Sequence, residues 1–307
     1  MALTSLVLLL VLDQARLQPW VYQYILVLGV LLAYTFQKKE KRSEVYPVLS
    51  MIIVFMYLYS GLSKINPTFF NEVSIWMIEP ITQQVSVWAQ GPFLMVSKGI
   101  PFLEIGVAVG LIFKSTRKYA GVILIMIHIF ILILIGPLGH DWNSVVWPWN
   151  IFSILFILLL FIYNKGLDFR KIISASESLL FKFFFLLVCV LPILSFFNLW
   201  DSYLSFNLYS GNVHNGVLLF EEEAKGRLSS NYQDEIPMKP IPGGYMVNIQ
   251  QWSIEDISVP SNPSVRVYKS IVSQVCSVPG LSLTLLIERR ALPFGSKQRH
   301  YYQCDEV

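Results

Sequence analysis

Residues 119–139 have the sequence YAGVILIMIHIFILILIGPLG, a run of 21 residues in which His128 is the only acidic, basic or histidine side chain. A transmembrane helix needs about 20 mainly apolar residues to cross the roughly 30 Å of hydrocarbon in a bilayer. The run meets that length without a lysine, arginine, aspartate or glutamate. It therefore predicts a membrane-spanning helix, and with it an integral membrane protein.

Apolar stretches of similar character lie on both sides of this run. They cover about residues 145–163 and 179–199 after it, and 19–36, 45–63 and 99–113 before it. The stretch 99–113 is short, but residues 93–96 extend it upstream. Residues 2–12 reach only about 16 Å as a helix at 1.5 Å per residue, so they form a half-helix or an incomplete span. We expect a membrane all-α bundle of about six to seven transmembrane helices.

The stretch between Lys64 and Lys98 contains aromatic residues and proline but no full span. Trp76 and Trp88 lie in it, and tryptophan is enriched where helices meet the membrane–water interface. We therefore expect interfacial or re-entrant helices here, covering a cavity.

The charges divide the chain into two parts. Residues 1–200 hold 9 acids and 14 bases, whereas residues 201–307 hold 11 acids and 9 bases in about half the length. The first part has too few charges to cover a soluble surface, and 54% of the whole chain is hydrophobic. We predict a transmembrane domain over 1–200 and a small α+β domain over 201–307. A net charge of +3 spread in this way gives no basic face for nucleic acid.

The lysines and arginines of the first part predict its orientation. Eleven of the 14 bases lie in Lys38–Arg42, Lys114–Lys118 and Lys165–Lys182, and the alternate loops hold only Arg16, Lys64 and Lys98. Loops rich in lysine and arginine stay in the cytoplasm. The chain is therefore expected to be a multi-pass protein of a bacterial inner membrane or its equivalent. Its C-terminal domain would lie on the periplasmic or outer side.

The C-terminal part alternates strand and helix patterns. Strands are expected at 216–220, 245–250, 281–288 and 300–303, a loop at 224–244 and an amphipathic helix after Asn262-Pro263. Cys276 and Cys304 both fall in this part, where an oxidising compartment lets a disulfide persist. We favour a structural disulfide between them over free thiols. The three cysteines form no CxxC spacing, so no cysteine-based metal site is expected.

Three ionisable side chains in or at the ends of spans are candidate catalytic residues: Lys64, Glu104 and His128. Such groups are costly inside a membrane and mark functional sites by default. Each also has a structural explanation. Lys64 can extend to the interface, a protonated Glu104 can bond a neighbouring helix beside Gly106, and His128 can be a bonded core histidine. A desolvated lysine at a helix end can instead lose its proton and act as a base.

A polar group at the same outer boundary provides candidate ligand-binding residues. It comprises Asp13, Arg16, Gln18 and Trp20 at the start of an early span, and Asn66 two residues after Lys64. An aspartate and an arginine three positions apart often form only a structural ion pair. At the helical rise, Glu104 and His128 lie roughly 10–15 Å further into the membrane. All of these residues are therefore expected in the outer half of the bilayer.

The order of these residues resembles the HTTM fold, the transmembrane core of the vitamin K-dependent γ-carboxylase family, over about residues 5–200. The most specific match is Ser60-Gly-Leu-Ser-Lys64-Ile-Asn66-Pro-Thr-Phe-Phe70, which resembles the family's Gly–x–x–Lys–Leu–Asn/Asp–x–x–Phe/Trp motif. Phe102-Leu-Glu104, the basic turn and the span with His128 resemble its acid-bearing and histidine-bearing spans. DoxX-like redox membrane proteins share a similar acid-bearing bundle and are the competing resemblance.

The resemblance implies a quinone or hydroquinone cofactor. Lys64 would be the base that starts hydroquinone oxygenation, and Glu104 and His128 would orient the ring or relay protons. The chain differs from the family because Trp20 or a neighbour replaces an expected histidine, and because its tail of 107 residues is short. What remains is a quinol- or lipid-sized cavity with a lysine base, without a complete γ-carboxylation reaction.

Two other functions remain open, so whether the chain is an enzyme is undecided at this stage. It can be a non-catalytic subunit or adaptor of a cell-envelope complex, with other envelope proteins docking on residues 201–307. It can also be a DoxX-like subunit in quinone-linked electron transfer. The expected partners are in each case the lipid bilayer and, for the last two, other proteins.

Overall fold

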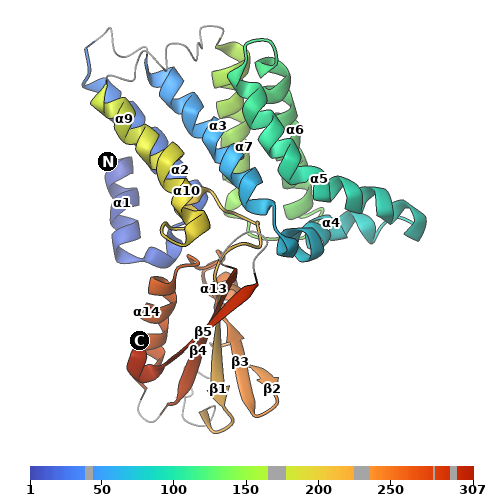
Figure 1. The fold of residues 1–307 in the computed structure, drawn as a ribbon, viewed down its shortest axis with the longest axis vertical. Coiled ribbons are helices and arrows are strands. Elements are labelled where there is room, and N and C mark those ends of the chain that lie inside the picture. The colour runs from blue at the N-terminus through green and yellow to red at the C-terminus, as the bar shows by residue number, and fades with distance from the viewer. Residues whose placement is uncertain (39–43, 165–177, 225–235, 279–280, 291–295) are drawn as a thin grey trace. The chain divides into compact units, whose positions relative to one another are not determined.

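The computed structural model describes the chain except residues 39–43, 165–177, 225–235, 279–280 and 291–295 (Figure 1). The basic loops at 38–42 and 165–182 and the predicted loop at 224–244 lie largely outside the described residues. The chain forms two compact units. Unit 1 comprises Met1–Leu8 and Gln18–Asn212, and unit 2 comprises Leu9–Leu17 and Val213–Val307. The main boundary thus lies 12 residues after the predicted one.

Unit 1 is helical. Its main helices are α1 (Ala2–Leu12), which continues into unit 2, α2 (Pro19–Thr35), α3 (Val45–Lys64), α4 (Ser74–Thr82), α5 (Val87–Ile112), α6 (Arg117–Ile135), α7 (Val146–Ile157), α9 (Leu179–Phe185) and α10 (Leu191–Leu194). Wider π-helical turns precede α4 at Phe69–Val73, extend α7 through Leu158–Tyr163 and join α9 to α10 at Leu186–Val190. Single 3₁₀ turns follow at Ser195–Phe197 and Tyr203–Ser205.

Five helices among the described residues are long and apolar enough to cross a membrane. They are Val45–Lys64, Val87–Ile112, Arg117–Ile135, Val146–Tyr163 and Leu179–Phe197. Helices α1 and α2 are apolar but shorter, at 11 and 17 residues. Residues 2–12 therefore form a helix of the predicted length.

Helix α5 is longer than the apolar stretch at 99–113 predicted. It begins at Val87 and includes Trp88 and Pro92, which were expected in interfacial or re-entrant helices. Proline already has a helical φ angle, and neighbouring turns can compensate for the hydrogen bond that it removes. Only Phe69–Thr82 therefore forms the separate short helical segment between α3 and α5.

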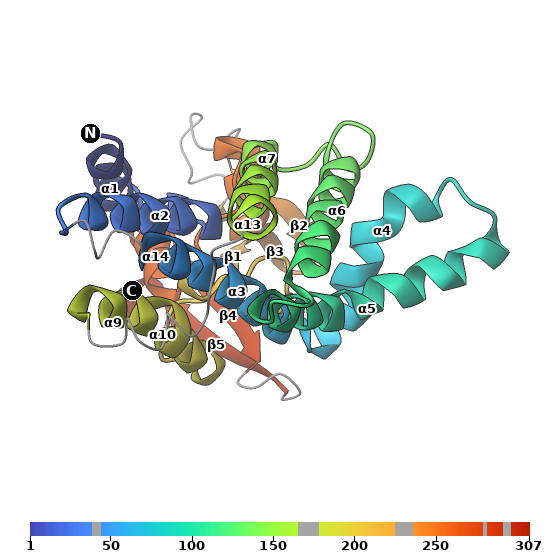
Figure 2. The same ribbon diagram turned by 90° about the horizontal axis from the view of Figure 1, so that it is seen from above.

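Helix α3 is at the centre of unit 1, in contact with α2, α5 and α9 (Figure 2). Its side chains are buried on several faces, including Val48, Ile52 and Ile53. Gly61 allows the closest approach, because a Cβ atom there would lie 2.7 Å from the Pro101 carbonyl oxygen of α5. The α3–α5 crossing therefore depends on a residue without a side chain.

Unit 2 contains a five-stranded antiparallel sheet in the order β2-β3-β1-β4-β5. The strands are β1 (Asn215–Glu221), β2 (Lys239–Ile241), β3 (Gly244–Asn248), β4 (Leu283–Arg290) and β5 (Lys297–Gln303). Helices α13 (Ile249–Ile257) and α14 (Val265–Val275) complete the unit, with a last 3₁₀ turn at Cys304–Glu306. Leu218, Leu285, Tyr268 and Val272 are fully buried in the core between sheet and helices.

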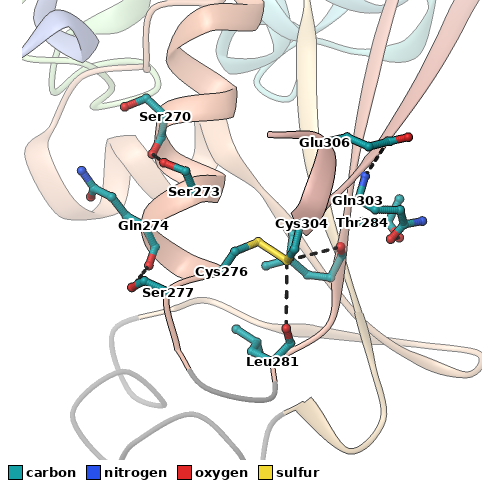
Figure 3. Close-up of a disulfide and its surroundings, with 11 residues drawn as sticks. Ser270, Ser273, Gln274, Cys276, Ser277, Leu281, Thr284, Gln303, Cys304 and Glu306 are labelled. Atoms are coloured by element: carbon teal, nitrogen blue, oxygen red, sulfur yellow. Dashed lines mark hydrogen bonds between the residues drawn. A yellow bond between two sulfur atoms is a disulfide. The ribbon is translucent and has the colours of Figure 1, made fainter.

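The predicted disulfide is present between Cys276, directly after α14, and Cys304, directly after β5 (Figure 3). It joins positions 28 residues apart and fastens the end of the helix to the edge of the sheet. Cys189 is a buried free thiol in the last apolar helix.

Candidate functional site

A cavity of about 520 Å³ lies within unit 1. Helices α3, α4, α5, α6 and α7 and residues 206–209 line it. Most of the wall is apolar, and α4 contributes Trp76, Met77 and Ile78. The polar side chains in the wall are few: Tyr57, Ser60, Lys64, Ser97, Glu104, His128, Asn150 and Tyr209.

Lys64 and Glu104 form a buried ion pair in this wall. The Lys64 ammonium lies 2.9 and 3.1 Å from the two carboxylate oxygens of Glu104. It also donates to the hydroxyl of Ser60 at 2.5 Å and to the Ser60 carbonyl at 3.3 Å. Lys64 is 5% exposed and Glu104 6%. Lys64 therefore does not extend to solvent, so the structure does not support the simple interfacial explanation.

The helix crossing explains why these two side chains meet although 40 residues separate them. Gly61 and Lys64 are three residues apart on α3, and Pro101 and Glu104 are three residues apart on α5. Residues three apart lie on the same helix face. The close contact between Gly61 and Pro101 thus brings the two helix faces together, and the Lys64 side chain runs back along α3 past Ser60 to reach Glu104.

A second polar group, formed by Tyr57, His128 and Asn150, links three helices. The Tyr57 hydroxyl bonds His128 Nε2, and His128 Nδ1 lies 2.7 Å from Asn150 Oδ1. Asn150 Nδ2 donates to the Val146 carbonyl at 2.8 Å, which fixes the orientation of the amide. Asn150 Oδ1 can only accept, so in a neutral imidazole Nδ1 carries the hydrogen and Nε2 accepts from Tyr57. The network therefore selects one tautomer of His128.

Helix α3 joins the two groups. Tyr57, Ser60 and Lys64 follow the spacing i, i+3, i+7 and all line the cavity. They form a polar stripe along one face of an otherwise apolar helix. The three predicted catalytic residues, Lys64, Glu104 and His128, therefore line a single cavity.

No protein-family model, curated protein or solved structure matches the chain. The resemblance to the HTTM and DoxX-like families therefore remains a prediction that depends on the motif around Lys64.

The predicted ligand-binding residues do not gather at the ion pair, and none of them lines the cavity. Asn66 is fully buried and uses its amide within the fold: Nδ2 donates to the carbonyls of Ser63 and Ser210, both at 2.8 Å, and Oδ1 accepts from the Phe69 amide. It closes the end of α3 against residues 203–212. Its geometry is that of a structural residue.

The remaining four ligand-binding candidates are divided between the units. Gln18 is the buried residue before α2, and Trp20 packs edge-on against Tyr24 with ring centroids 5.9 Å apart. Asp13 and Arg16 belong to unit 2 and pair with each other at 2.7 Å, the structural arrangement considered above. Asp13 also accepts from the Ala15 amide at 3.0 Å.

Tyr57, Ser60 and Asn150 were not predicted as site residues, because acidic, basic and histidine side chains are the conspicuous ones in apolar spans. The spacing of Tyr57 and Ser60 before Lys64 was a usable signal, since it places all three on one helix face. Asn150 lies beside Trp149 near the start of the predicted span 145–163, where a single neutral amide is not conspicuous. Among the described residues, no three His, Cys, Asp or Glu side chains are grouped so as to hold a metal ion.

Proposed function

We propose that unit 1 is embedded in a membrane and binds an amphipathic lipid-phase molecule, an isoprenoid hydroquinone or a similar compound, with Lys64 and Glu104 as its proton-transfer pair. The observation that carries the proposal is a buried ion pair in the wall of an apolar cavity of about 520 Å³. Burying two charges costs several kcal/mol, and a hydrophobic pair of similar size would often stabilise a fold equally well. A contribution to stability therefore does not explain why this site contains a buried ion pair.

The cavity suits such a molecule in size and in chemistry. Binding sites for small molecules commonly have volumes of about 300–1,000 Å³, apolar walls and a few placed polar groups. The side chains of Ser60, Lys64 and Glu104 offer donors and acceptors for one hydroxyl or carbonyl group, and Tyr57 and His128 offer others. The apolar wall accepts a ring and its hydrocarbon substituent.

The ion pair can move a proton without leaving a lone charge in the apolar site. Transfer of one proton from Lys64 Nζ to Glu104 converts ammonium and carboxylate into a neutral amine and a carboxylic acid. Lys64 Nζ can then accept a proton from a hydroxyl in the cavity, and the ammonium so formed stabilises the resulting oxyanion. A bound hydroquinone would supply an acidic hydroxyl and two reducing equivalents. The network with Tyr57 and Asn150 fixes the tautomer of His128, so Tyr57 and His128 can orient a polar group of the bound molecule.

The proposed orientation follows from charge. With the basic loops in the cytoplasm, unit 2 lies on the periplasmic or outer side. The disulfide in unit 2 fits an oxidising compartment. The HTTM-like motif around Lys64 supports the assignment of Lys64 as base.

Binding of a defined probe tests the proposal. Menaquinone-4 is titrated into the full chain in nanodiscs, and the double variant Lys64→Met/Glu104→Gln is compared with the wild type. The double variant removes both charges together and so avoids an unpaired buried charge. We expect at least tenfold weaker binding, about 1.4 kcal/mol. Lys98→Met, an exposed lysine of α5 outside the cavity, is the control and should bind like the wild type.

Equal binding by the double variant and the wild type would reject the ion pair as the site. Absence of saturable binding to the wild type would reject a quinone as ligand.

A docking role for unit 2 is the second candidate function. Among the described strands, β5 pairs only with β4 and forms an edge of the sheet. It exposes most of its side chains, Tyr301 among them. An edge strand can pair with a strand of another protein. A stoichiometric protein that co-purifies with the wild type and is lost from Tyr301→Pro would favour the adaptor or subunit. If the Tyr301→Pro variant retains that protein, β5 is not the docking edge.

A further inference from the structure

Several apolar side chains in the cavity wall are also exposed on the outside of unit 1. On α5 these are Phe93, 37% exposed, Val96, 70% exposed, and Leu103, 43% exposed. On α6, Met126 is 60% exposed, and Val122, Ile123 and Phe130 are between 38% and 47% exposed. A side chain that lines a cavity and is also exposed lies at the edge of an opening. These residues therefore mark a gap between α5 and α6.

The arrangement of the two helices produces the gap. They pack most closely near the turn that joins them, where a Cβ atom on Gly110 would lie 3.1 Å from the Ala120 side chain. Thr116 Oγ1 and Arg117 Nε fasten this end by donating to the carbonyls of Gly110 and Leu111 at 2.7 and 3.0 Å. From the turn the helices diverge, and α4 lies near their far ends and packs against both (Figure 2). The cavity is thus open at the side, between two apolar helices.

We propose that a hydrocarbon chain of a bilayer lipid enters the cavity through this gap, so that the ligand is taken up laterally from the membrane. The inference rests on the membrane placement in the proposed function. Helices α5 and α6 are two of the five that are long and apolar enough to span a bilayer. In that placement, Leu103 and Met126 contact the acyl chains of the bilayer lipids.

The chemistry of the rim identifies the occupant. The seven exposed rim side chains carry no charge and no N–H, O–H or carbonyl group, whereas Lys64, Glu104 and His128 in the same wall are between 3% and 6% exposed. A water-soluble ligand would have to lose its hydration at this rim with no compensating hydrogen bond. A lipid meets hydrocarbon-like side chains throughout its entry and hydrogen bonds only at the inner end. The arrangement fits a molecule with an apolar tail in the gap and a polar head at the ion pair.

Photolabelling tests the lateral entry without knowledge of the natural ligand. The full chain is placed in nanodiscs of phosphatidylcholine that carries a diazirine on one acyl chain, and the labelled residues are mapped after illumination. We expect label on Met56 and Leu134, which line the cavity but are 3% and 1% exposed. Label confined to outward residues such as Val109 and Ile133, with none on Met56 or Leu134, would overturn the proposal.

Variants at the rim provide matched controls. Leu103→Trp and Met126→Trp fill the gap, and they should reduce labelling of Met56 and Leu134 at least fivefold. Val109→Trp and Ile133→Trp lie on the same helices at similar exposure, 44% and 46%, but outside the cavity wall, and should leave labelling unchanged. Equal labelling in all four variants would show that the acyl chain does not pass between α5 and α6.

The same reagent separates this inference from the proposed chemistry. If lateral entry is correct, Lys64→Met/Glu104→Gln keeps the acyl-chain label on Met56 and Leu134, because the rim is intact, even where menaquinone-4 binding is lost. Loss of the interior label in that variant would mean that the acyl chain depends on the ion pair, which would overturn the passive lateral route.

Discussion

At the scale of single residues, the contribution of the Lys64–Glu104 ion pair to stability can be tested by removing one charge at a time. Lys64→Met leaves the Glu104 carboxylate buried without its partner, and Glu104→Gln leaves an uncompensated ammonium. Breaking a buried pair from one side costs about 3–5 kcal/mol, whereas removing both charges costs much less. In thermal unfolding of the full chain, each single variant should therefore melt well below the wild type.

The double variant Lys64→Met/Glu104→Gln should recover most of that loss, and Lys98→Met should unfold like the wild type. If the single and double variants are equally unstable, the two charges are not coupled, and the ion pair would not be the feature that organises the cavity.

His214 in unit 2 gives a prediction of pH dependence. Burial lowers its pKa to about 3, and repulsion from Arg289 and His300 adds to the effect; Arg289 Nη1 lies 3.2 Å from His214 Nε2. An unfolded histidine titrates near pH 6.5, so the unfolded state binds the proton first as the pH falls. This contribution to stability is therefore complete above about pH 6.5 and is lost between pH 6.5 and 3. At pH 5 the loss is about 2 kcal/mol.

Hydrogen exchange of β1 and β4 peptides in the full chain measures this loss. After correction for intrinsic exchange rates, protection should fall from pH 7 to pH 5 in the wild type and change less in His214→Gln. An equal fall in both proteins would assign the pH dependence to another group.

At the scale of elements, the α3–α5 crossing determines whether the site exists. Gly61→Ala would place a Cβ atom 2.7 Å from the Pro101 carbonyl oxygen and 2.8 Å from Ile105 Cγ1, so the helices must separate. Overpacking of this kind costs about 1–3 kcal/mol. We expect a lower melting temperature and weaker menaquinone-4 binding, because the Lys64–Glu104 distance increases.

Gly106→Ala is the control, because no neighbouring side chain or helix lies within 4 Å of the new Cβ. It should be neutral or slightly stabilising. Equal effects of the two substitutions would disprove the close crossing.

The elements also show what the sequence could and could not predict. Apolar runs such as 119–139 located the long helices, because a continuous apolar stretch has a strong length signal. The predictions of four strands, β1, β3, β4 and β5, and of helix α14 were confirmed. Alternation and helical spacing of apolar side chains can both be read from neighbouring residues in the sequence. Helix α13 was missed, because its residues carry no clear apolar periodicity, and the three-residue β2 was too short to detect. The predicted start of α5 was wrong because Trp88 and its neighbours were assigned to interfacial or re-entrant helices.

The residues of the site could also be predicted only where the signal was local in the sequence. Lys64, Glu104 and His128 were found because ionisable groups in apolar runs are conspicuous, but their pairing depends on a helix crossing at Gly61 that no local pattern shows. Asn66 was assigned to the ligand because it lies two residues after Lys64 in the motif, whereas its amide closes the end of α3. Tertiary contacts alone separate these roles.

At the scale of the whole molecule, the three cysteines report on which side of the membrane unit 2 lies. A disulfide between Cys276 and Cys304 closes a segment of 28 residues and stabilises unit 2 by about 3–4 kcal/mol in the loop-entropy model. It persists only in an oxidising compartment. Cys189 is a free thiol in an apolar helix. In cells lysed directly into denaturant with a maleimide-polyethylene glycol, we expect one labelled thiol per chain without reductant and three after reduction.

Cys276→Ser is the control, because it frees Cys304 and should give two labelled thiols with or without reductant. Three labelled thiols in the unreduced wild type would place unit 2 in a reducing compartment and reverse the proposed orientation. That reversal would leave the cavity unchanged but would put its Lys64–Glu104 end on the cytoplasmic side. The basic loops would then face outward, against the rule on which the orientation rests. One measurement on three residues therefore decides the direction of the entire chain.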